Sequence, residues 1–574
     1  MRRELRARAL AAVVVLVLGL CGCAAIPTSG PVGKSDPLPV TDTPVNFGFR
    51  QNPPAKGADP SSIVQGFVQS GTGIQDDFQV ARQYLSKAAG QSWKSDARTL
   101  VYKNDFKITS AVEGPDGTAT VQADFTVQSV VDDAGIMTPA AAGRVDTIKF
   151  GLVQVDGQWR IDTVPDGIML QSSNFSQLFT SYPLYFYDPT FTYAVPDVRW
   201  ISNKTQTTAT QIVKAILNGP APYLKGAVAS AFPDGMNLVR DSVPITNGVA
   251  QVDLAPQPLL DATVKARQQM QAQLQLTLQL DLNTVTSVTL RADTRTVEVT
   301  GGPDPVPPVP IANNQVPDRQ VAVSKGTLVG YTTGQVSAID GMPDLSALKP
   351  AHPAMSYSKQ LFAFLSQDSS QLYSVAPGQP AQLVAAGSRF TPPSFSPQDW
   401  LWTAAGDGSG AVLAVHPGAS KEAAAPVQLN IRWLAGRTVT SLRISRDGAR
   451  VLVVSELNGV SLVQLAGIIS TDGTPKDFTT PLTLSTTATA TEGVWVNETT
   501  VAVMEPASSG STVVELLSLR GDPIQLAPLS RVQTISAGNT VLDIYAQTDN
   551  AIYLRTGNGW SQQIKSVQDA SYAG

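Results

Sequence analysis

Two cysteines, Cys21 and Cys23, offer thiol chemistry in this 574-residue sequence, and they are its only cysteines. A thiolate is a nucleophile and a metal ligand. Both stand directly after a short apolar run, Leu10 to Leu20, which follows four arginines and one glutamate. A basic start, a short apolar stretch and small residues are typical of a secretory signal peptide that is removed. The run is also shorter than the roughly 20 apolar residues that cross a bilayer. Residues 1–22 are therefore predicted to be a cleaved signal peptide.

The tetrad Leu20-Cys21-Gly22-Cys23 resembles the bacterial lipobox. The resemblance implies that Cys23 becomes the first residue of the mature chain, as an S-diacylglycerol and N-acyl cysteine. Cys21 fits less well, because Leu20 would then stand before the cut, where a small side chain is needed. Two acyl chains anchor a protein stably, whereas one chain binds a membrane only marginally. We therefore expect a lipid anchor at the extracytoplasmic face of the cell membrane and, after processing, no thiol free for a disulfide or a metal site.

Other residues that could carry chemistry stand in turn-like contexts. His352 and His416 are each followed by proline and are predicted to be surface turn residues between strands. Asp132-Asp133 could in principle serve acid/base work or calcium binding, but its place between strands favours a solvated turn. Gly71-Thr72-Gly73 is predicted to link two helices, because no strand precedes it and no Gly-Lys-Ser/Thr follows. The sequence thus indicates no nucleophile–base pair or metal cluster, and we expect no enzyme activity, metal or cofactor.

The composition limits the partners of the chain. Only 15% of the residues are charged, the formal net charge is −5, and no basic block follows the leader. A nucleic-acid partner is therefore not expected. Residues 23–60 contain eight prolines, which keep a chain extended, and are predicted to be a semi-rigid tether behind the lipid.

Residues 61–182 are predicted to form a first domain. Apolar residues recur at helical spacing in two stretches, the second led by Asp76-Asp77 with Phe78, Ala81, Leu85 and Ala88 facing inward. The period then changes to two, and Asp156-Gly157 marks a hairpin. Helices followed by a curved antiparallel sheet resemble the nuclear-transport-factor-2-like (NTF2-like) α+β fold.

Residues 183–300 are predicted to form a second α+β domain. A strand through Val198-Arg199-Trp200-Ile201 precedes an apolar helical pattern that stops at Asn218-Gly219-Pro220. Asn247-Gly248 predicts a hairpin, and the Gln-rich run Gln268–Gln279, only weakly amphipathic, predicts a solvated helix. The ordered run of Tyr-Phe-Tyr-Asp-Pro, Val-Arg-Trp-Ile, helix, Leu-Asn-Gly-Pro and Phe-Pro-Asp-Gly resembles a GerMN domain.

Residues 301–314 are predicted to be a linker, because five prolines within residues 301–310 cannot join a sheet or a helix. In residues 315–574, strand pairs flank polar turns that recur at Ser358, Ser396, Ser445 and Asn497, which lie 38, 49 and 52 residues apart. Spacings of 40 to 50 residues are typical of β-propeller blades. We expect an all-β propeller of about six blades.

Lipobox, tether, α+β domain, GerMN-like domain and propeller, in this order, resemble the LpqB family of actinobacterial lipoproteins. The start Cys23-Ala-Ala-Ile-Pro-Thr-Ser-Gly-Pro also fits this family. The resemblance implies a non-enzymatic accessory of the extracellular region of a sensor histidine kinase, MtrB of the MtrAB two-component system, with effects on cell-wall homeostasis and division.

Two other function classes stay open from the residues alone. A cell-wall glycan or peptide binder would use the propeller or the GerMN-like groove and would be retained on peptidoglycan without any kinase. An enzyme acting on wall polymers would lose turnover on single carboxylate substitutions.

Overall fold

The computed structural model of the protein describes residues 51–141, 143–203, 208–300, 309–417, 425–486, 488–507 and 509–574. The predicted signal peptide, Cys23 and most of the predicted tether lie outside these residues. Residues Gly48–Gly574 form one compact unit. Within the residues that the structure describes, no helix is long and apolar enough to cross a membrane.

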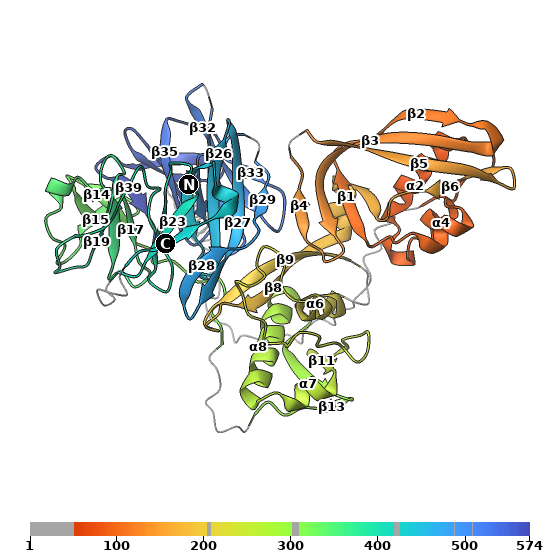
Figure 1. Ribbon diagram of the computed structural model, residues 1–574, viewed down its shortest axis with the longest axis horizontal. Coiled ribbons are helices and arrows are strands. Elements are labelled where there is room, and N and C mark those ends of the chain that lie inside the picture. Colours follow the sequence, from red (N-terminus) through yellow and green to blue (C-terminus); the bar gives the residue numbers. More distant parts are fainter. Residues whose placement is uncertain are drawn as a thin grey trace, which may run out of the picture. The chain divides into compact units, whose positions relative to one another are not determined.

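The first domain packs short helices against one mixed sheet (Figure 1), in which β1 and β7 pair in parallel and the other neighbours are antiparallel. Its strands follow the order β6-β5-β3-β1-β7, with β2 and β4 also paired to the long strand β3. The hairpin between β5 and β6 turns at Asp156-Gly157, where both residues have positive φ angles, as predicted. Helix α2 buries Ile63, Val64 and Phe67 toward the sheet. The helices are α2 (Pro60–Gln69), α3 (Gln79–Gln83), α4 (Lys87–Ser92) and α5 (Ser172–Leu178). The strands are β1 (Arg98–Tyr102), β2 (Lys107–Glu113), β3 (Thr118–Asp132), β4 (Met137–Pro139), β5 (Val145–Val155), β6 (Gln158–Thr163) and β7 (Ile168–Gln171).

The second helix predicted for this domain is two short helices instead. The backbone of Tyr84 to Ser86 leaves the helical path to hydrogen-bond with Ile161 of β6. Ser86 then caps α4, its hydroxyl accepting from the Ala89 N–H at 3.2 Å. As a result Ala89 is buried, whereas Ala88 is exposed. The prediction of one continuous helix was wrong because a strand contact replaced its middle turn.

The second domain begins with a two-stranded sheet and continues with helices that cover a four-stranded sheet. The hairpin at Asn247-Gly248 joins β10 to β11 with positive φ at both turn residues, as predicted. Strands β11 and β12 pair in parallel. The elements are β8 (Phe179–Tyr187), β9 (Ala194–Ser202), α6 (Thr208–Leu217), β10 (Ile245–Thr246), β11 (Val249–Leu254), α7 (Pro256–Asp261), α8 (Val264–Asp281), β12 (Ser287–Ala292) and β13 (Arg295–Thr296).

The Gln-rich helix α8 is a core helix rather than the solvated helix that its composition predicted. Met270, Leu274 and Leu278 are buried, and so are Gln273 and Thr277. The Gln273 amide donates to the Tyr185 carbonyl at 2.8 Å and accepts from the Ala231 N–H at 2.9 Å. The Thr277 hydroxyl accepts from the Tyr185 N–H at 3.1 Å. Buried polar side chains are tolerated when they are hydrogen-bonded, and here they hold β8 against the helix.

The third domain consists of six antiparallel sheets of four or five strands among the described residues, which confirms a propeller of six blades. Blade 1 contains β14 (Gln320–Ser324), β15 (Thr327–Thr332), β16 (Gln335–Ala338) and β39 (Gln568–Ser571). Blade 2 contains β17 (Ala351–Met355), β18 (Phe362–Leu365), β19 (Gln371–Val375) and β20 (Gln382–Ala386). Blade 3 contains β21 (Ser394–Phe395), β22 (Leu401–Ala404), β23 (Ala411–Val415) and β24 (Val427–Asn430).

Blades 4 and 5 each carry one additional short strand, and β39 closes the ring by pairing with β14 in blade 1. Blade 4 contains β25 (Thr438–Ile444), β26 (Arg450–Leu457), β27 (Val460–Thr471), β28 (Thr474–Phe478) and β29 (Leu482–Leu484). Blade 5 contains β30 (Glu492–Trp495), β31 (Thr500–Pro506), β32 (Ser511–Ser518), β33 (Ile524–Gln525) and β34 (Leu529–Ser530). Blade 6 contains β35 (Val532–Ala537), β36 (Ile544–Thr548), β37 (Ile552–Thr556) and β38 (Gly559–Ile564).

The polar turns that revealed the repeat join the first two strands of a blade. In blades 2, 3 and 4 the turn contains a serine, Ser356, Ser396 or Ser445. Its backbone N–H donates to the carbonyl of the residue that leads into or begins the next strand, and its hydroxyl accepts the N–H of that same residue. Blade 5 has the same backbone bond from Val496 without the hydroxyl. The repeat anchor in blade 2 is therefore Ser356 and not the predicted Ser358. The residue that follows each serine therefore lies just beyond the end of the first strand of its blade.

Candidate functional site

The chemistry-bearing residues singled out in the sequence do not come together. His352 lies within strand β17 and not in a turn as predicted, whereas His416 follows β23 directly and lies between strands, as predicted. Asp132 ends β3 and accepts from the Ile136 N–H at 2.8 Å, in the predicted turn. Thr72 lies in a short 3-10 helix after α2. Among the described residues, no group of three or more His, Cys, Asp or Glu side chains is placed to hold a metal ion.

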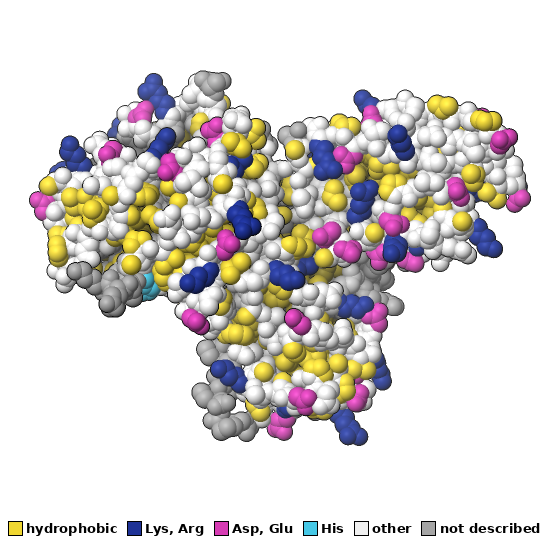
Figure 2. All heavy atoms as spheres, in the orientation of Figure 1, with side chains coloured by type: hydrophobic (Ala, Val, Ile, Leu, Met, Phe, Trp, Pro, Cys, Tyr) yellow, Lys and Arg dark blue, Asp and Glu magenta, His cyan; other side chains and the backbone are white. Residues whose placement is uncertain are grey.

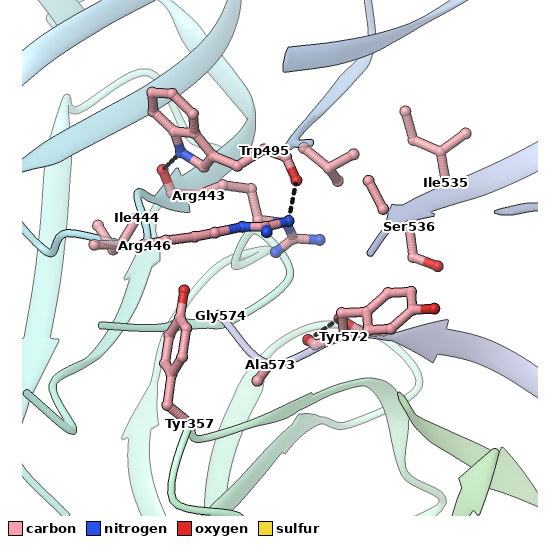
Figure 3. A pocket seen from close by; sticks show the side chains of 13 residues that line it. Tyr357, Arg443, Ile444, Arg446, Trp495, Ile535, Ser536, Tyr572, Ala573 and Gly574 are labelled. Carbon is pink, nitrogen blue, oxygen red and sulfur yellow. Dashed lines mark hydrogen bonds between the residues drawn. The ribbon is translucent and has the colours of Figure 1, made fainter. Parts of the chain in front are cut away.

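The inner ends of the blades surround a small cavity of about 40 Å³ (Figure 3). Its wall includes Tyr357 from the blade 2 turn, Arg446 from the blade 4 turn and Tyr572 after β39. Tyr357 and Arg446 occupy the same repeat position, directly after the turn serine. Their side chains point inward in Figure 3. The sequence signalled the turns but not that this position faces the centre of the ring.

The guanidinium of Arg446 is held by backbone and amide oxygens. It donates to the Gly538 carbonyl at 2.6 Å, the Trp495 carbonyl at 3.3 Å and Asn539 Oδ1 at 3.0 Å. Burial lowers the pKa of Arg446, since desolvation disfavours its charged form. These bonds tie the turn of blade 4 to the end of blade 5 and to blade 6.

Blade 4 contributes two further arginines, the fully buried Arg450 and the largely buried Arg443, which lines the cavity. Arg450 forms an ion pair with Asp447 at 2.6 Å, and its guanidinium lies 4.8 Å from the ring centre of Trp495. Arg443 contacts Glu492 of blade 5 at 3.4 Å, and the Trp495 indole N–H donates to the Arg443 carbonyl at 3.1 Å. Burial raises the pKa of Glu492 to about 7. Cation–π and ion-pair contacts thus join blades 4 and 5 at the centre.

The arrangement at the centre of the ring serves cohesion rather than ligand binding. Pockets for small molecules occupy about 300–1,000 Å³, whereas this cavity admits only a few water molecules. Each of the three arginines already donates to an oxygen of the protein. These side chains therefore hold the blades together at the centre of the ring, which we call the hub.

The second domain docks on the propeller through hydrogen bonds to blades 4 and 5. The Tyr185 hydroxyl donates to Glu498 Oε1 at 2.6 Å. The Tyr223 carbonyl accepts from the Gly467 N–H at 2.8 Å and from the Thr479 hydroxyl at 2.5 Å. Burial raises the pKa of Tyr185, because the phenolate would be desolvated next to Glu498.

Apolar side chains fill the same interface. Val195, Ala221, Tyr223 and Leu224 of the second domain form one buried cluster with Ala449 of blade 4. The fit is close at Gly467, where an added Cβ would lie 2.4 Å from Ala227 Cβ. Such close packing resembles a protein interior and holds the two domains as one body.

The described part of the linker crosses the propeller next to the central cavity. Asn313 N–H donates to Glu498 Oε2 at 3.0 Å, and the Asn314 amide donates to the Arg446 carbonyl at 3.0 Å. Val316 exchanges two hydrogen bonds with the Asn539 side chain, at 2.8 Å each. The same turns that form the hub therefore also bind the chain that leads into the propeller.

Three family models match consecutive parts of the chain. Residues 53–176 match the model described as lipoprotein LpqB, N-terminal domain. Residues 183–298 match the Germane model, described as sporulation and spore germination. Residues 326–572 match the lipoprotein LpqB beta-propeller domain. The three matches follow the order of the three domains in the structure.

Several relatives named lipoprotein LpqB are similar to the chain. The Thermobifida fusca protein is 25% identical over 573 residues, with 90% of each chain covered. The Rhodococcus jostii protein is 26% identical over 470 residues, 77% of this chain and 76% of that one. The Bifidobacterium longum protein is 30% identical over 209 residues, only 35% of this chain and 36% of its own length.

Among solved structures, the Kuenenia stuttgartiensis hydrazine synthase has a TM-score of 0.31 at 12% identity, covering 45% of this chain and 80% of that one. Two LpqB-specific models and full-length similarity to lipoproteins of that name agree with the order of domains. The chain belongs to the LpqB family of lipoproteins.

Proposed function

We propose that this lipoprotein is held at the extracytoplasmic face of the cell membrane through acylated Cys23 and works there by binding, as a non-enzymatic accessory. The lipobox tetrad that ends at Cys23 supports the anchor. The name that its relatives carry supports the class of protein.

The binding role is supported by one observation, namely that the centre of the propeller is filled and that the second domain is packed against the propeller. The arginines at the centre are engaged with the protein's own oxygens, and the cavity there is small. The buried interface around Tyr223 fixes the two domains to each other. A rigid body of this kind presents one composite surface, which favours recognition of a partner.

The surface itself is mixed in charge. On the face seen in Figure 2, basic and acidic side chains are interspersed, with hydrophobic side chains between them. Protein interfaces are on average about as apolar as the rest of the surface, with a polar rim. A surface of this composition is compatible with a protein partner.

The partner in this proposal is the extracellular region of an MtrB-type sensor histidine kinase. The choice of a kinase rests on the resemblance to the LpqB family. A lipid anchor confines both proteins to one membrane, which raises the effective concentration toward the millimolar range. A contact with a dissociation constant of only about 1 μM, roughly −8 kcal/mol, would then be highly occupied.

The test reconstitutes the lipidated chain and the kinase in the same nanodiscs. We expect direct binding and a changed rate of autophosphorylation, and neither effect with a kinase that lacks its extracellular domain. A protein that leaves phosphorylation unchanged and does not bind the kinase, but is retained on purified peptidoglycan, would be a wall-binding lipoprotein instead.

A further inference from the structure

A second cavity, with a volume of about 620 Å³, lies in the first domain. Helix α2, the strands β1, β2 and β7, and the start of α5 contribute to its wall. Its volume falls within the 300–1,000 Å³ that is usual for ligand pockets. It is more than ten times larger than the cavity at the centre of the propeller.

One part of the wall is aromatic. Phe106 stacks on Phe125, with ring centres 5.1 Å apart and planes 14° apart, and Tyr102 packs edge-on against both. Tyr102 is buried, which raises the pKa of its hydroxyl to about 12 and keeps it a neutral hydrogen-bond donor. Phe106 is partly exposed and lines the cavity. Its ring therefore offers a platform on which a ligand could stack.

Four neutral amide side chains line the same cavity: Gln65, Gln69, Gln171 and Asn174. Gln65 and Gln69 lie one helical turn apart on α2, so they share one side of the helix. None of the four side chains has a hydrogen-bond partner among the described residues, whereas neighbouring Thr72 accepts from the Gln51 amide at 3.2 Å. Each amide offers two donors and one acceptor.

The charges around the cavity argue against an ionic ligand. Asp105 is the one charged side chain among the described residues that line it, and no lysine or arginine joins it. An anion would meet this carboxylate without a cation to pair with, at a desolvation cost. A purely apolar ligand would strip water from four amides and return no hydrogen bond.

A neutral sugar can contact both the aromatic part and the amide-lined part of the cavity wall. One face of a pyranose ring carries mostly C–H groups and can stack on an aromatic ring, while its hydroxyl or acetamido groups both donate and accept. We propose that the cavity of the first domain binds a neutral sugar unit, which stacks on Phe106 and hydrogen-bonds to the amides of Gln69 and Asn174.

The experiment titrates the full chain in detergent with N,N′-diacetylchitobiose and cellobiose as neutral sugars, and with digalacturonic acid and hexanol as acidic and apolar probes. We expect a neutral sugar to bind with a dissociation constant below about 1 mM. The acidic and apolar probes should bind at least tenfold more weakly.

Two variants test the place of binding. Gln69→Ala combined with Asn174→Ala should weaken sugar binding at least tenfold, while Gln83→Ala, an exposed glutamine of α3 outside the cavity, should leave it unchanged. Ile108→Trp should fill the cavity and abolish binding. Val112→Trp, at an exposed position of the same strand outside the cavity, is its matched control.

Melting curves establish that each variant is folded. The proposal is overturned if neither neutral sugar binds at concentrations up to about 10 mM. It is also overturned if the acidic or the apolar probe binds more tightly than the neutral sugars, or if the cavity variants bind sugar as tightly as the native chain does. Each of these outcomes is independent of the kinase experiment, which uses a different readout.

Discussion

At the scale of single residues, Asp447 shows how the repeat turn is reinforced in blade 4. Its carboxylate accepts from the Ser445 hydroxyl at 2.6 Å and pairs with Arg450, which is fully buried. Removing one partner of a buried ion pair leaves an uncompensated charge and typically costs about 3–5 kcal/mol. We expect Asp447→Asn to lower the free energy of unfolding by about 3 kcal/mol in urea denaturation. Asp477→Asn, at an exposed site in β28, should change it by less than about 0.5 kcal/mol.

The lipid anchor is also a prediction about one residue. Cys23→Ala should abolish incorporation of an alkyne fatty acid during metabolic labelling and leave an uncleaved or mislocalised precursor. Cys21→Ala should still be labelled. Labelling of Cys23→Ala at the native level, together with its loss in Cys21→Ala, would assign the anchor to the other cysteine.

Asp281 makes stability depend on pH at the interface between the second domain and the propeller. The pKa of this carboxyl is raised to about 7, because burial and the nearby charge of Glu498 outweigh the opposing charge of Arg520, 3.5 Å away. The folded state then binds the proton more tightly than the unfolded state, whose pKa is about 3.9. Its stabilising contribution is complete below about pH 4 and is lost as the pH rises through 7.

We therefore expect the free energy of unfolding to fall between pH 5 and pH 8, by roughly 2 kcal/mol through Asp281 alone once solvent screening is allowed for. Asp281→Asn should reduce this fall without removing it, because the pKa of Glu492 is also about 7. Chemical denaturation at both pH values measures the difference. An unchanged pH dependence in the variant would show that Asp281 titrates normally.

At the scale of elements, Gly467 of β27 allows the loop around Tyr223 to approach blade 4. A Cβ at this position would lie 2.4 Å from Ala227 Cβ and 3.1 Å from the Tyr223 carbonyl. Overpacking of this kind typically costs about 1–3 kcal/mol. We expect Gly467→Ala to lower the melting temperature by several degrees, whereas Gly559→Ala, which meets only one atom at 3.9 Å, should not.

The elements that the sequence predicted well are those with local signals. Asn247-Gly248 and Asp156-Gly157 mark their hairpins because both turn positions need positive φ angles. The polar turns at Ser396 and Ser445 recur because each serine hydroxyl binds the next strand.

The elements that the sequence predicted poorly depend on distant partners. Helix α8 is polar in composition, yet Gln273 is buried because the backbone of Tyr185, far away in the chain, satisfies its amide. The approach of Gly467 to Tyr223 likewise depends on a partner far away in the chain, because the Gly467 N–H donates to the Tyr223 carbonyl. Of the amides that line the cavity of the first domain, Gln65 and Gln69 share α2, but Gln171 and Asn174 come from β7 and α5, so no spacing in the sequence joins the two pairs.

At the scale of the whole molecule, the second domain and the propeller should stay together without a covalent link. A protease site inserted after Gly302 should allow complete cleavage, and the two fragments should still co-elute in gel filtration, because the interface around Tyr223 and Glu498 is buried. Adding Gly467→Ala should release them. Fragments that separate at once in the native background would mean that the proline-rich segment alone joins the domains.

The closure of blade 1 by β39 also bears on how the protein is made. Val321 pairs with Ser571, 250 residues further along the chain. A chain that is made from its amino end produces β39 only after the other five blades, so β14 has an open edge until then. Open strand edges invite pairing with other chains, and contacts between distant residues form slowly. The interval before closure is therefore when this lipoprotein depends most on protection by folding factors.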